Sequence, residues 1–214
     1  MAVEKEIIHI GFNCPENIPE AILNGLTVEL DTTGLNIEIK RLPIPIYNAF
    51  EWAIPGIIAA YILKPYFESF LKEAGKDHYN HLSKWLKSLV TKARHIKVHT
   101  VAASQSTEKL DSTYSQSKSI SVYCQTRDDR IIKLLFDETL TDSDWQNAID
   151  KIIELLNENY AKTSDDKLTE QLKTLNQKNR TFYAFIDRNT KEWIFKDDQE
   201  LVQIRISNSK AEKN

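Results

Sequence analysis

The stretch LPIPIYNAFEWAIPGIIAAYIL (42–63) limits the possible folds more than any other part of the sequence. Its 22 residues carry a single charge, Glu51. By length alone it could cross the hydrocarbon core of a bilayer, which takes about 20 apolar residues. Four prolines interrupt it or follow it closely: Pro43, Pro45, Pro55 and Pro65. Because proline breaks a helical ladder, the best helical piece, 55–64, would reach only about 15 Å. We therefore expect an apolar helical hairpin that is covered by protein or touches a membrane surface.

The segment after this stretch is basic and amphipathic. Apolar residues recur at steps of three and four from 66 to 94, which predicts one long helix with an apolar face. Residues 64–97 hold eight Lys or Arg against three acids, whereas 141–178 are acidic on balance. The basic helix would suit an anionic membrane surface, and it would equally suit the acidic helices of the same chain. The side chains predicted to contact a partner or a membrane are Trp52, Ile54, Ile57, Ile58, Tyr61, Tyr66, Phe67, Phe70, Lys72 and Lys76.

The remaining segments predict an α+β fold. Strands are expected at 6–13, 26–30, 35–42, 96–103 and 201–206, hairpins at 121–137 and 181–195, and helices that begin near Thr141 and Ser164. Because the strands come in groups and the helices in pairs, we expect mixed or antiparallel sheets built from hairpins rather than parallel βαβ units. These sheets would pack on the long amphipathic helix (66–94) and on a C-terminal helix pair.

The Ser-rich segment 104–119 is the natural seam between two lobes, and it is predicted to be a mobile loop. The lobes would be an N-terminal α+β lobe, 1–103, and a C-terminal ββααββ lobe, 120–206, followed by a frayed tail, 207–214. A single domain is the alternative division.

The composition indicates a folded protein of the cytoplasm. The alternative is a protein that is peripheral to the membrane. Hydrophobic residues make up 41% and charged residues 28%, and the formal net charge of −3 makes nucleic acid an unlikely partner. Two cysteines, Cys14 and Cys124, cannot form a disulfide framework, which favours a reducing compartment. The N-terminus lacks a basic region followed by an apolar core, so no signal peptide is predicted.

Two constellations could carry chemistry. Asp31 followed by Glu38 and Lys40 has the outline of the metal-dependent nuclease pattern, in which carboxylates hold Mg²⁺ and a lysine helps to activate water. An exposed alternating strand beside a turn aspartate would look the same. Asp77, His78 and His81 could begin a metal site on a helix, but a hydrogen-bonded core histidine is the ordinary explanation for His78. No catalytic residue, metal or cofactor is predicted from these patterns.

The block ILKPYFESFLKEAGKDHYNHLSKWLK (62–87), preceded by AFEWAIP (49–55), resembles a segment of bacterial proteins of uncharacterised function. The resemblance covers residues 49–87 and implies a bacterial setting without an activity. We expect an interaction module without catalysis, whose apolar 48–71 segment and basic helix contact a protein partner or a second copy. The alternatives are a membrane-active effector that uses the same segment, and a metal-dependent nuclease or hydrolase.

Overall fold

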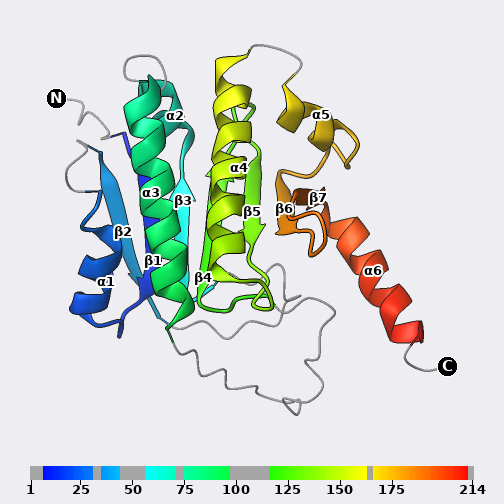
Figure 1. Cartoon of the computed structure of the whole chain (residues 1–214), viewed down its shortest axis with the longest axis horizontal. Helices are drawn as coiled ribbons and strands as arrows, with labels where there is room; N and C mark the ends of the chain where they lie inside the picture. The colour runs from blue at the N-terminus through cyan, green and yellow to red at the C-terminus, as the bar shows by residue number, and fades with distance from the viewer. Residues whose placement is uncertain are drawn as a thin grey trace.

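A seven-stranded mixed sheet forms the centre of the molecule (Figure 1). The computed structural model describes residues 7–30, 35–43, 56–70, 75–96, 116–162 and 166–211. The strand order is β2-β1-β3-β4-β5-β6-β7. The strands are β1 (Ile10–Pro15), β2 (Ile37–Leu42), β3 (Ile58–Ile62), β4 (Ile120–Gln125), β5 (Ile131–Leu135), β6 (Thr181–Ile186) and β7 (Trp193–Lys196). The helices are α1 (Glu20–Thr27), α2 (Lys64–Phe70), α3 (Gly75–Arg94), α4 (Asp142–Ala161), α5 (Lys167–Lys173) and α6 (Asp198–Ala211).

The α+β class and the mixed sheet are confirmed, but the sheet also contains connections that the sequence did not predict. Strands β1 and β2, β3 and β4, and β5 and β6 pair in parallel, and helices lie between the members of each pair along the chain. Parallel neighbours need such a crossover, so these are three βαβ units placed side by side. The units meet through antiparallel pairs, β1 with β3 and β4 with β5, and β7 closes the sheet antiparallel to β6.

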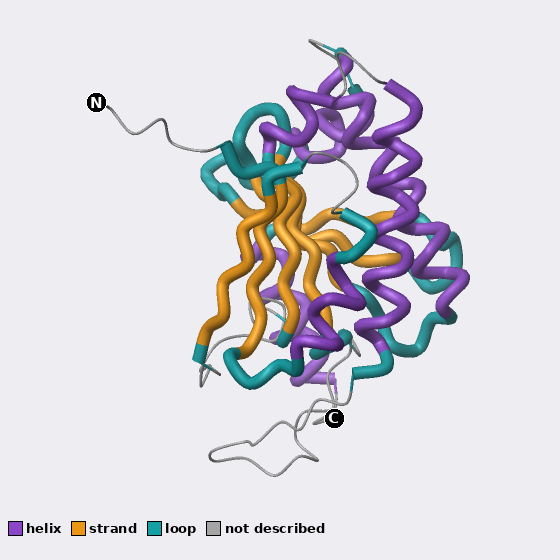
Figure 2. Tube along the Cα trace, turned by 90° about the vertical axis from the view of Figure 1, so that its left-hand side faces the viewer, coloured by secondary structure: helices purple, strands orange, loops and turns teal. Residues whose placement is uncertain are grey.

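Helices α3 and α4 cover one face of the sheet, and Figure 2 shows them as a layer on one side of the strands. The residues beneath them alternate along each strand, as a face buried by helices requires. One row across this face consists of Phe12, Ala60, Val122, Leu134, Ala184 and Phe195, and every member is buried. Three tryptophans complete this core, and each indole N–H donates to a backbone carbonyl: Trp85 to Leu26, Trp145 to Asp137 and Trp193 to Ala148.

The predicted hairpins and the C-terminal helix pair are confirmed. Strands β4 and β5 turn at the predicted aspartates, where Asp129 has a positive φ of 63°. Helix α4 begins at a capping box: the Asp144 amide donates to Thr141 Oγ1, and the Thr141 amide donates to the Asp144 carboxylate. Asp166 caps α5 by accepting the Thr169 amide. Local signals of this kind were sufficient to place these elements.

Several predicted elements were wrong. Residues 26–30 are not a strand, because α1 extends to Thr27 and is followed by a turn. The apolar stretch contributes strand β3 in place of the expected helical hairpin. The single helix expected over 66–94 is two helices, α2 and α3. The strand expected at 96–103 stays a prediction, because residues 97–103 lie outside the described residues.

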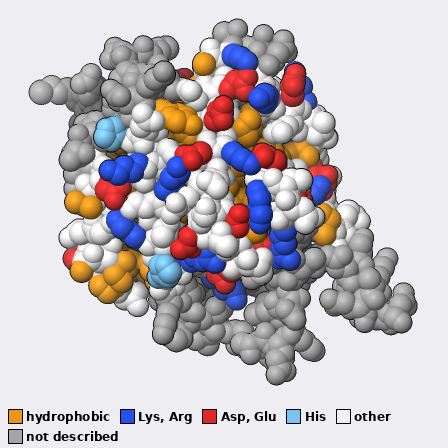
Figure 3. All heavy atoms as spheres, in the orientation of Figure 1, with side chains coloured by type: hydrophobic (Ala, Val, Ile, Leu, Met, Phe, Trp, Pro, Cys, Tyr) orange, Lys and Arg blue, Asp and Glu red, His pale blue; other side chains and the backbone are white. Residues whose placement is uncertain are grey.

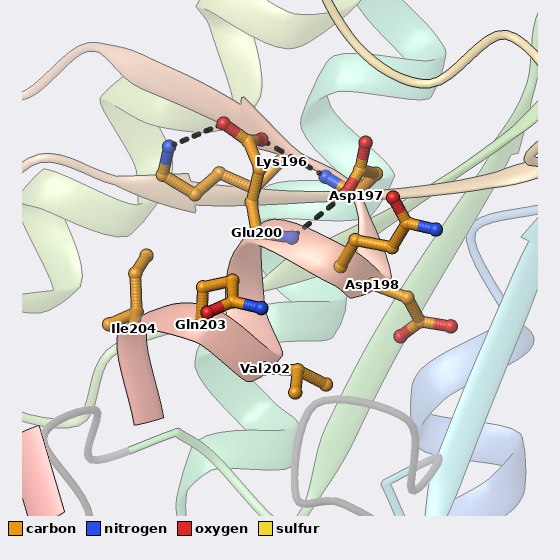
Figure 4. A pocket seen from close by; sticks show the side chains of 8 residues that line it. Lys196, Asp197, Asp198, Glu200, Val202, Gln203 and Ile204 are labelled. Atoms are coloured by element: carbon orange, nitrogen blue, oxygen red, sulfur yellow. Dashed lines mark hydrogen bonds and ion pairs between the residues drawn. The ribbon is translucent and has the colours of Figure 1, made fainter. Parts of the chain in front are cut away.

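The last predicted strand, 201–206, is part of helix α6 (Figure 4). Its first turn is closed by Asp197, which accepts the Glu200 amide at 2.9 Å, while the Asp197 amide donates to the Glu200 carboxylate at 3.4 Å. Asp-x-x-Glu is a capping box, a signal in the sequence that the alternation of 201–206 outweighed. Helix α6 also continues through most of the predicted frayed tail.

Strands of both predicted lobes belong to one sheet. Strand β3 of the first lobe pairs along its whole length with β4 of the second, from Ile58 opposite Ile120 to Ile62 opposite Cys124. Of the predicted mobile loop, 104–115 lie outside the described residues, and Gln116 forms an isolated bridge with Asp137.

Candidate interaction surface

The apolar stretch that was predicted to contact a partner enters the centre of the sheet. Ile58 in β3 is 0% exposed, and Tyr66 and Phe67 in α2 are 4% and 3% exposed. The Phe67 ring stacks on Tyr160 of α4 at 4.5 Å between centroids. These three side chains are core residues and offer no surface to a partner. Trp52, Ile54 and Lys72 lie outside the described residues, as do the side chains of Phe70 and Lys76.

Among the described contact residues that the sequence predicted, Ile57 lines a concave surface. It lines a groove of about 710 Å³ between α1 and the end of α3, which we call the α1/α3 groove. Its lining residues are Pro15, Asn17, Ile18, Pro19, Ala21, Ile22, Gly25, Leu26, Ile57, Lys92, His95 and Ile96. The walls are therefore mainly apolar, and Ile22 is 37% exposed. Apolar walls with few polar groups are typical of binding sites.

Lys92 in the last turn of α3 and His95 just after the helix join this apolar lining. The Lys92 ammonium donates to the Gly25 carbonyl at 2.9 Å and lies 3.3 Å from the Glu29 carboxylate. Its side chain is still 46% exposed, and His95 is exposed. Among the described residues, no Asp or Glu belongs to the lining. An occupant with apolar side chains and a carboxylate would complement this surface in shape and in charge.

The basic helix is paired mainly within the molecule, as one of the two readings of its charge predicts. Lys87 of α3 lies 2.5 Å from Asp150 of α4, and Arg94 lies 2.7 Å from Asp142. The Arg94 guanidinium also stacks over the Trp145 ring at 4.5 Å. Figure 3 accordingly shows Lys and Arg interspersed with Asp and Glu over the face that α3 and α4 form. Among the described side chains, this face shows no patch made of basic residues alone.

A row of tyrosines and a buried lysine crosses the other face of the sheet. The register aligns Tyr61, Tyr123, Lys133 and Tyr183 on four neighbouring strands. The Tyr61 and Tyr123 rings stack at 4.6 Å, and the Lys133 ammonium lies 5.7 Å from the Tyr123 centroid. Lys133 is 1% exposed, and burial lowers its pKa to about 7. Burial and the neighbouring Asp198 raise the pKa of Tyr183 to about 12.

Helix α6 covers part of this second face. Leu201 packs against Leu135, Tyr183 and Phe185 in a small apolar cluster that is separate from the main core. Within the described part of the chain, the residues that line the hollow beside α6 in Figure 4 lie between Lys196 and Ile204. The sequence predicted contact for Tyr61 but missed the row. Tyr123, Lys133 and Tyr183 belong to strands that are adjacent only in the folded sheet.

The residues considered for metal chemistry are dispersed or lie outside the described part. Glu38 and Lys40 share one face of β2, as predicted, but they form an ion pair with each other at 2.8 Å. Asp31 and the side chains of Asp77 and His78 lie outside the described residues, and His81 is exposed on α3. Among the residues that the structure describes, no group of three His, Cys, Asp or Glu could hold a metal ion.

Both cysteines are packed in the interior. Cys14 and Cys124 are buried free thiols, and burial raises the pKa of each, that of Cys124 to about 12. The thiolate is the reactive form of cysteine, so these environments suit packing rather than nucleophilic chemistry. Within the described ranges, no helix has the length and apolar character needed to span a bilayer.

The fold and this surface define the chain as an α+β protein with a mixed sheet, with α3 and α4 on one face, α6 on part of the other, and an apolar groove between α1 and the end of α3. Comparison with protein-family models, with curated proteins and with solved structures found no match. The resemblance of residues 49–87 to a bacterial segment stays a prediction.

Proposed function

We propose that this protein is an interaction module without catalysis, and that its α1/α3 groove binds an apolar, acidic segment of a partner protein. The observation that carries the proposal is the lining of the groove. The walls include Ile22 of α1, Ile57 just before β3 and Ile96 just after α3. The ionisable groups of the described lining are Lys92 and His95. Partner segments that combine apolar anchors with carboxylates meet both requirements.

The proposed contact surface agrees only in part with the surface expected from the sequence. Ile57 and the end of the basic helix remain contact groups, whereas the middle of the apolar stretch becomes core. Insertion of residues 48–71 into a membrane would require β3 to leave its place between β1 and β4. That rearrangement would expose the side chains that β3 now buries, so a protein partner is the better supported occupant.

The proposal places the protein in the cytoplasm of a bacterium. Two buried free cysteines without a disulfide are usual in a reducing compartment. The bacterial setting rests on the resemblance of residues 49–87 alone.

Ile22→Glu tests the groove, because Ile22 lines it and is accessible. The probe is a fluorescein-labelled amphipathic peptide of Leu and Glu, compared with a matched peptide of Leu and Lys. We expect the acidic peptide to bind the wild type more tightly. Ile22→Glu should raise its dissociation constant about tenfold or more, because the new carboxylate repels the peptide and removes apolar contact. Fluorescence anisotropy measures both constants.

Val28→Glu is the matched control. It makes the same chemical change at a residue that is 55% exposed and does not line the groove, so binding should be unchanged. Equal affinity for the two peptides, or no binding of the acidic peptide at millimolar concentration, would contradict the proposal. Binding to phosphatidylglycerol vesicles that Ile22→Glu abolishes, without peptide binding, would favour the membrane alternative instead.

A further inference from the structure

Strand β2 forms one edge of the sheet and is unusually exposed. Among the described residues it pairs with β1 only, at the left margin of the sheet in Figure 1. Residues 38–42 are all exposed, and the apolar side chains of Ile39 and Leu42 are 42% and 44% exposed. An exposed apolar edge strand is a ready template for pairing with another strand, and natural proteins usually protect such an edge.

The hydrogen bonds to β1 fix which peptide groups of β2 point outward. The Asn36 carbonyl accepts the Ile10 amide, and the Leu42 carbonyl accepts the Glu16 amide. Even-numbered residues therefore direct their peptide groups toward β1. Because these directions alternate along a strand, the odd-numbered residues Ile37, Ile39 and Arg41 direct theirs away from the sheet. An incoming strand would pair with these three residues.

We propose that β2 pairs antiparallel with β2 of a second copy of this chain, with Ile39 opposite Ile39 of the partner subunit. For the two copies to form hydrogen bonds, the odd-numbered residues of one β2 must lie opposite the odd-numbered residues of the other. The two-fold axis between the copies must therefore pass through a residue position and not between two residues. Placed at Ile39, it sets Glu38 opposite Lys40 of the partner subunit, and Lys40 opposite Glu38 of the partner subunit. Placed at Glu38 or at Lys40, it would oppose identical charges. Opposite charges across an antiparallel pair stabilise it, whereas like charges destabilise it.

This register also uses the two faces of β2 consistently. Glu38 and Lys40 form an ion pair at 2.8 Å, and their side chains are 45% and 56% exposed, so both can meet a second copy. In the proposed register these charges lie at positions without cross-strand hydrogen bonds, where opposing side chains are closest. The Ile39 side chain lies on the face of β2 opposite to Glu38 and Lys40. In the dimer it would pack against Ile39 of the partner subunit. A second copy would thus pair the charges of Glu38 and Lys40, cover the apolar side chain of Ile39 and form hydrogen bonds with the outward backbone groups of β2.

Charge reversal and charge exchange test the register. Glu38→Lys would oppose two lysines on each side of the axis, and the Glu38→Lys/Lys40→Glu double variant would restore opposite charges. A single strand pair is a small interface, so we expect a concentration-dependent monomer–dimer equilibrium. The dimer dissociation constant should rise about tenfold or more in the single variant and return to near the wild-type value in the double variant. Sedimentation velocity of the full chain, from micromolar to submillimolar concentrations, measures it.

The matched control is Glu154→Lys, the same charge reversal at an exposed position of α4, which should leave the dimer unchanged. Ile39→Cys gives an independent readout, because opposed cysteines on the axis should oxidise to a disulfide-linked dimer, whereas Val28→Cys should not. A wild type that stays monomeric at all concentrations and an uncrosslinked Ile39→Cys would overturn the proposal. Weakening by Glu38→Lys without recovery in the double variant would overturn this register.

Discussion

Gly56→Ala is expected to lower the free energy of unfolding by about 3 kcal/mol or more. Gly56 lies just before β3, and a Cβ on it would lie 2.6 Å from the Ile120 carbonyl carbon and 2.8 Å from the Ile120 nitrogen. Backbone atoms cannot move aside as the end of a side chain can. Relief would require β3 and β4 to separate in the middle of the sheet, where both strands are buried. Urea denaturation followed by circular dichroism measures the loss.

Gly25→Ala is the matched control for this substitution. Gly25 lies inside α1, and a Cβ there would meet nothing within 4 Å. Alanine should therefore raise the free energy of unfolding by about 0.5 to 1 kcal/mol, because it lowers the entropy of the unfolded chain and favours helix. If the two variants had the same stability, close approach at Gly56 would not be the constraint.

Lys133→Met is expected to raise the free energy of unfolding at pH 6 by about 2 to 4 kcal/mol. Lys133 is 1% exposed on β5, between Tyr123 and Tyr183 of the neighbouring strands. Burial lowers its pKa from the ordinary value of 10.5 to about 7, so below pH 7 the folded protein holds a desolvated ammonium. Methionine keeps a flexible apolar stem of similar size and removes the charge, so the folded state no longer bears this cost.

The pH dependence follows from the direction of the same shift. Between pH 7 and 10.5 the unfolded chain holds a proton on Lys133 that the folded chain has released. The unfolded state then binds more protons, so Lys133 makes stability rise with pH across this window. The raised pKa of Cys124 works in the opposite sense above pH 9, and it contributes equally to wild type and variant. The difference between the two proteins should therefore shrink from pH 7 upward.

Chemical denaturation of wild type and Lys133→Met at pH 6, 8 and 9 tests this expectation. Lys84→Met is the control, because it makes the same substitution at an exposed position of α3 and should leave the free energy of unfolding almost unchanged. A Lys133→Met variant that is less stable at every pH would show that the ammonium stabilises the fold. Equal slopes for wild type and variant would show that Lys133 keeps its ordinary pKa in the folded protein.

Part of the candidate surface could be predicted from the sequence. The apolar stretch and the basic helix drew attention to Ile57 and to the end of α3, and both line the α1/α3 groove. Ile22 and Leu26 were not predicted as surface residues, because the alternation of 26–30 indicates a strand and α1 was not predicted from the sequence. Their spacing of four residues, continuing from Ile18, was the signal that could have placed them on one helical face. The partners of β2 and the tyrosine–lysine row had no comparable signal.

Short-range chemistry in the sequence was sufficient for the turn at Asp128 and Asp129, the cap at Thr141 and the hairpin of β6 with β7, because each depends on neighbours along the chain. The prolines predicted no long continuous helix over 42–63, and residues 56–63, which the structure describes, are not helical. Only the tertiary structure decided that IAAYI (58–62) is a strand. A short apolar run suits a buried helix or a buried strand equally, and here pairing with β1 on one side and β4 on the other satisfies its backbone and buries its side chains.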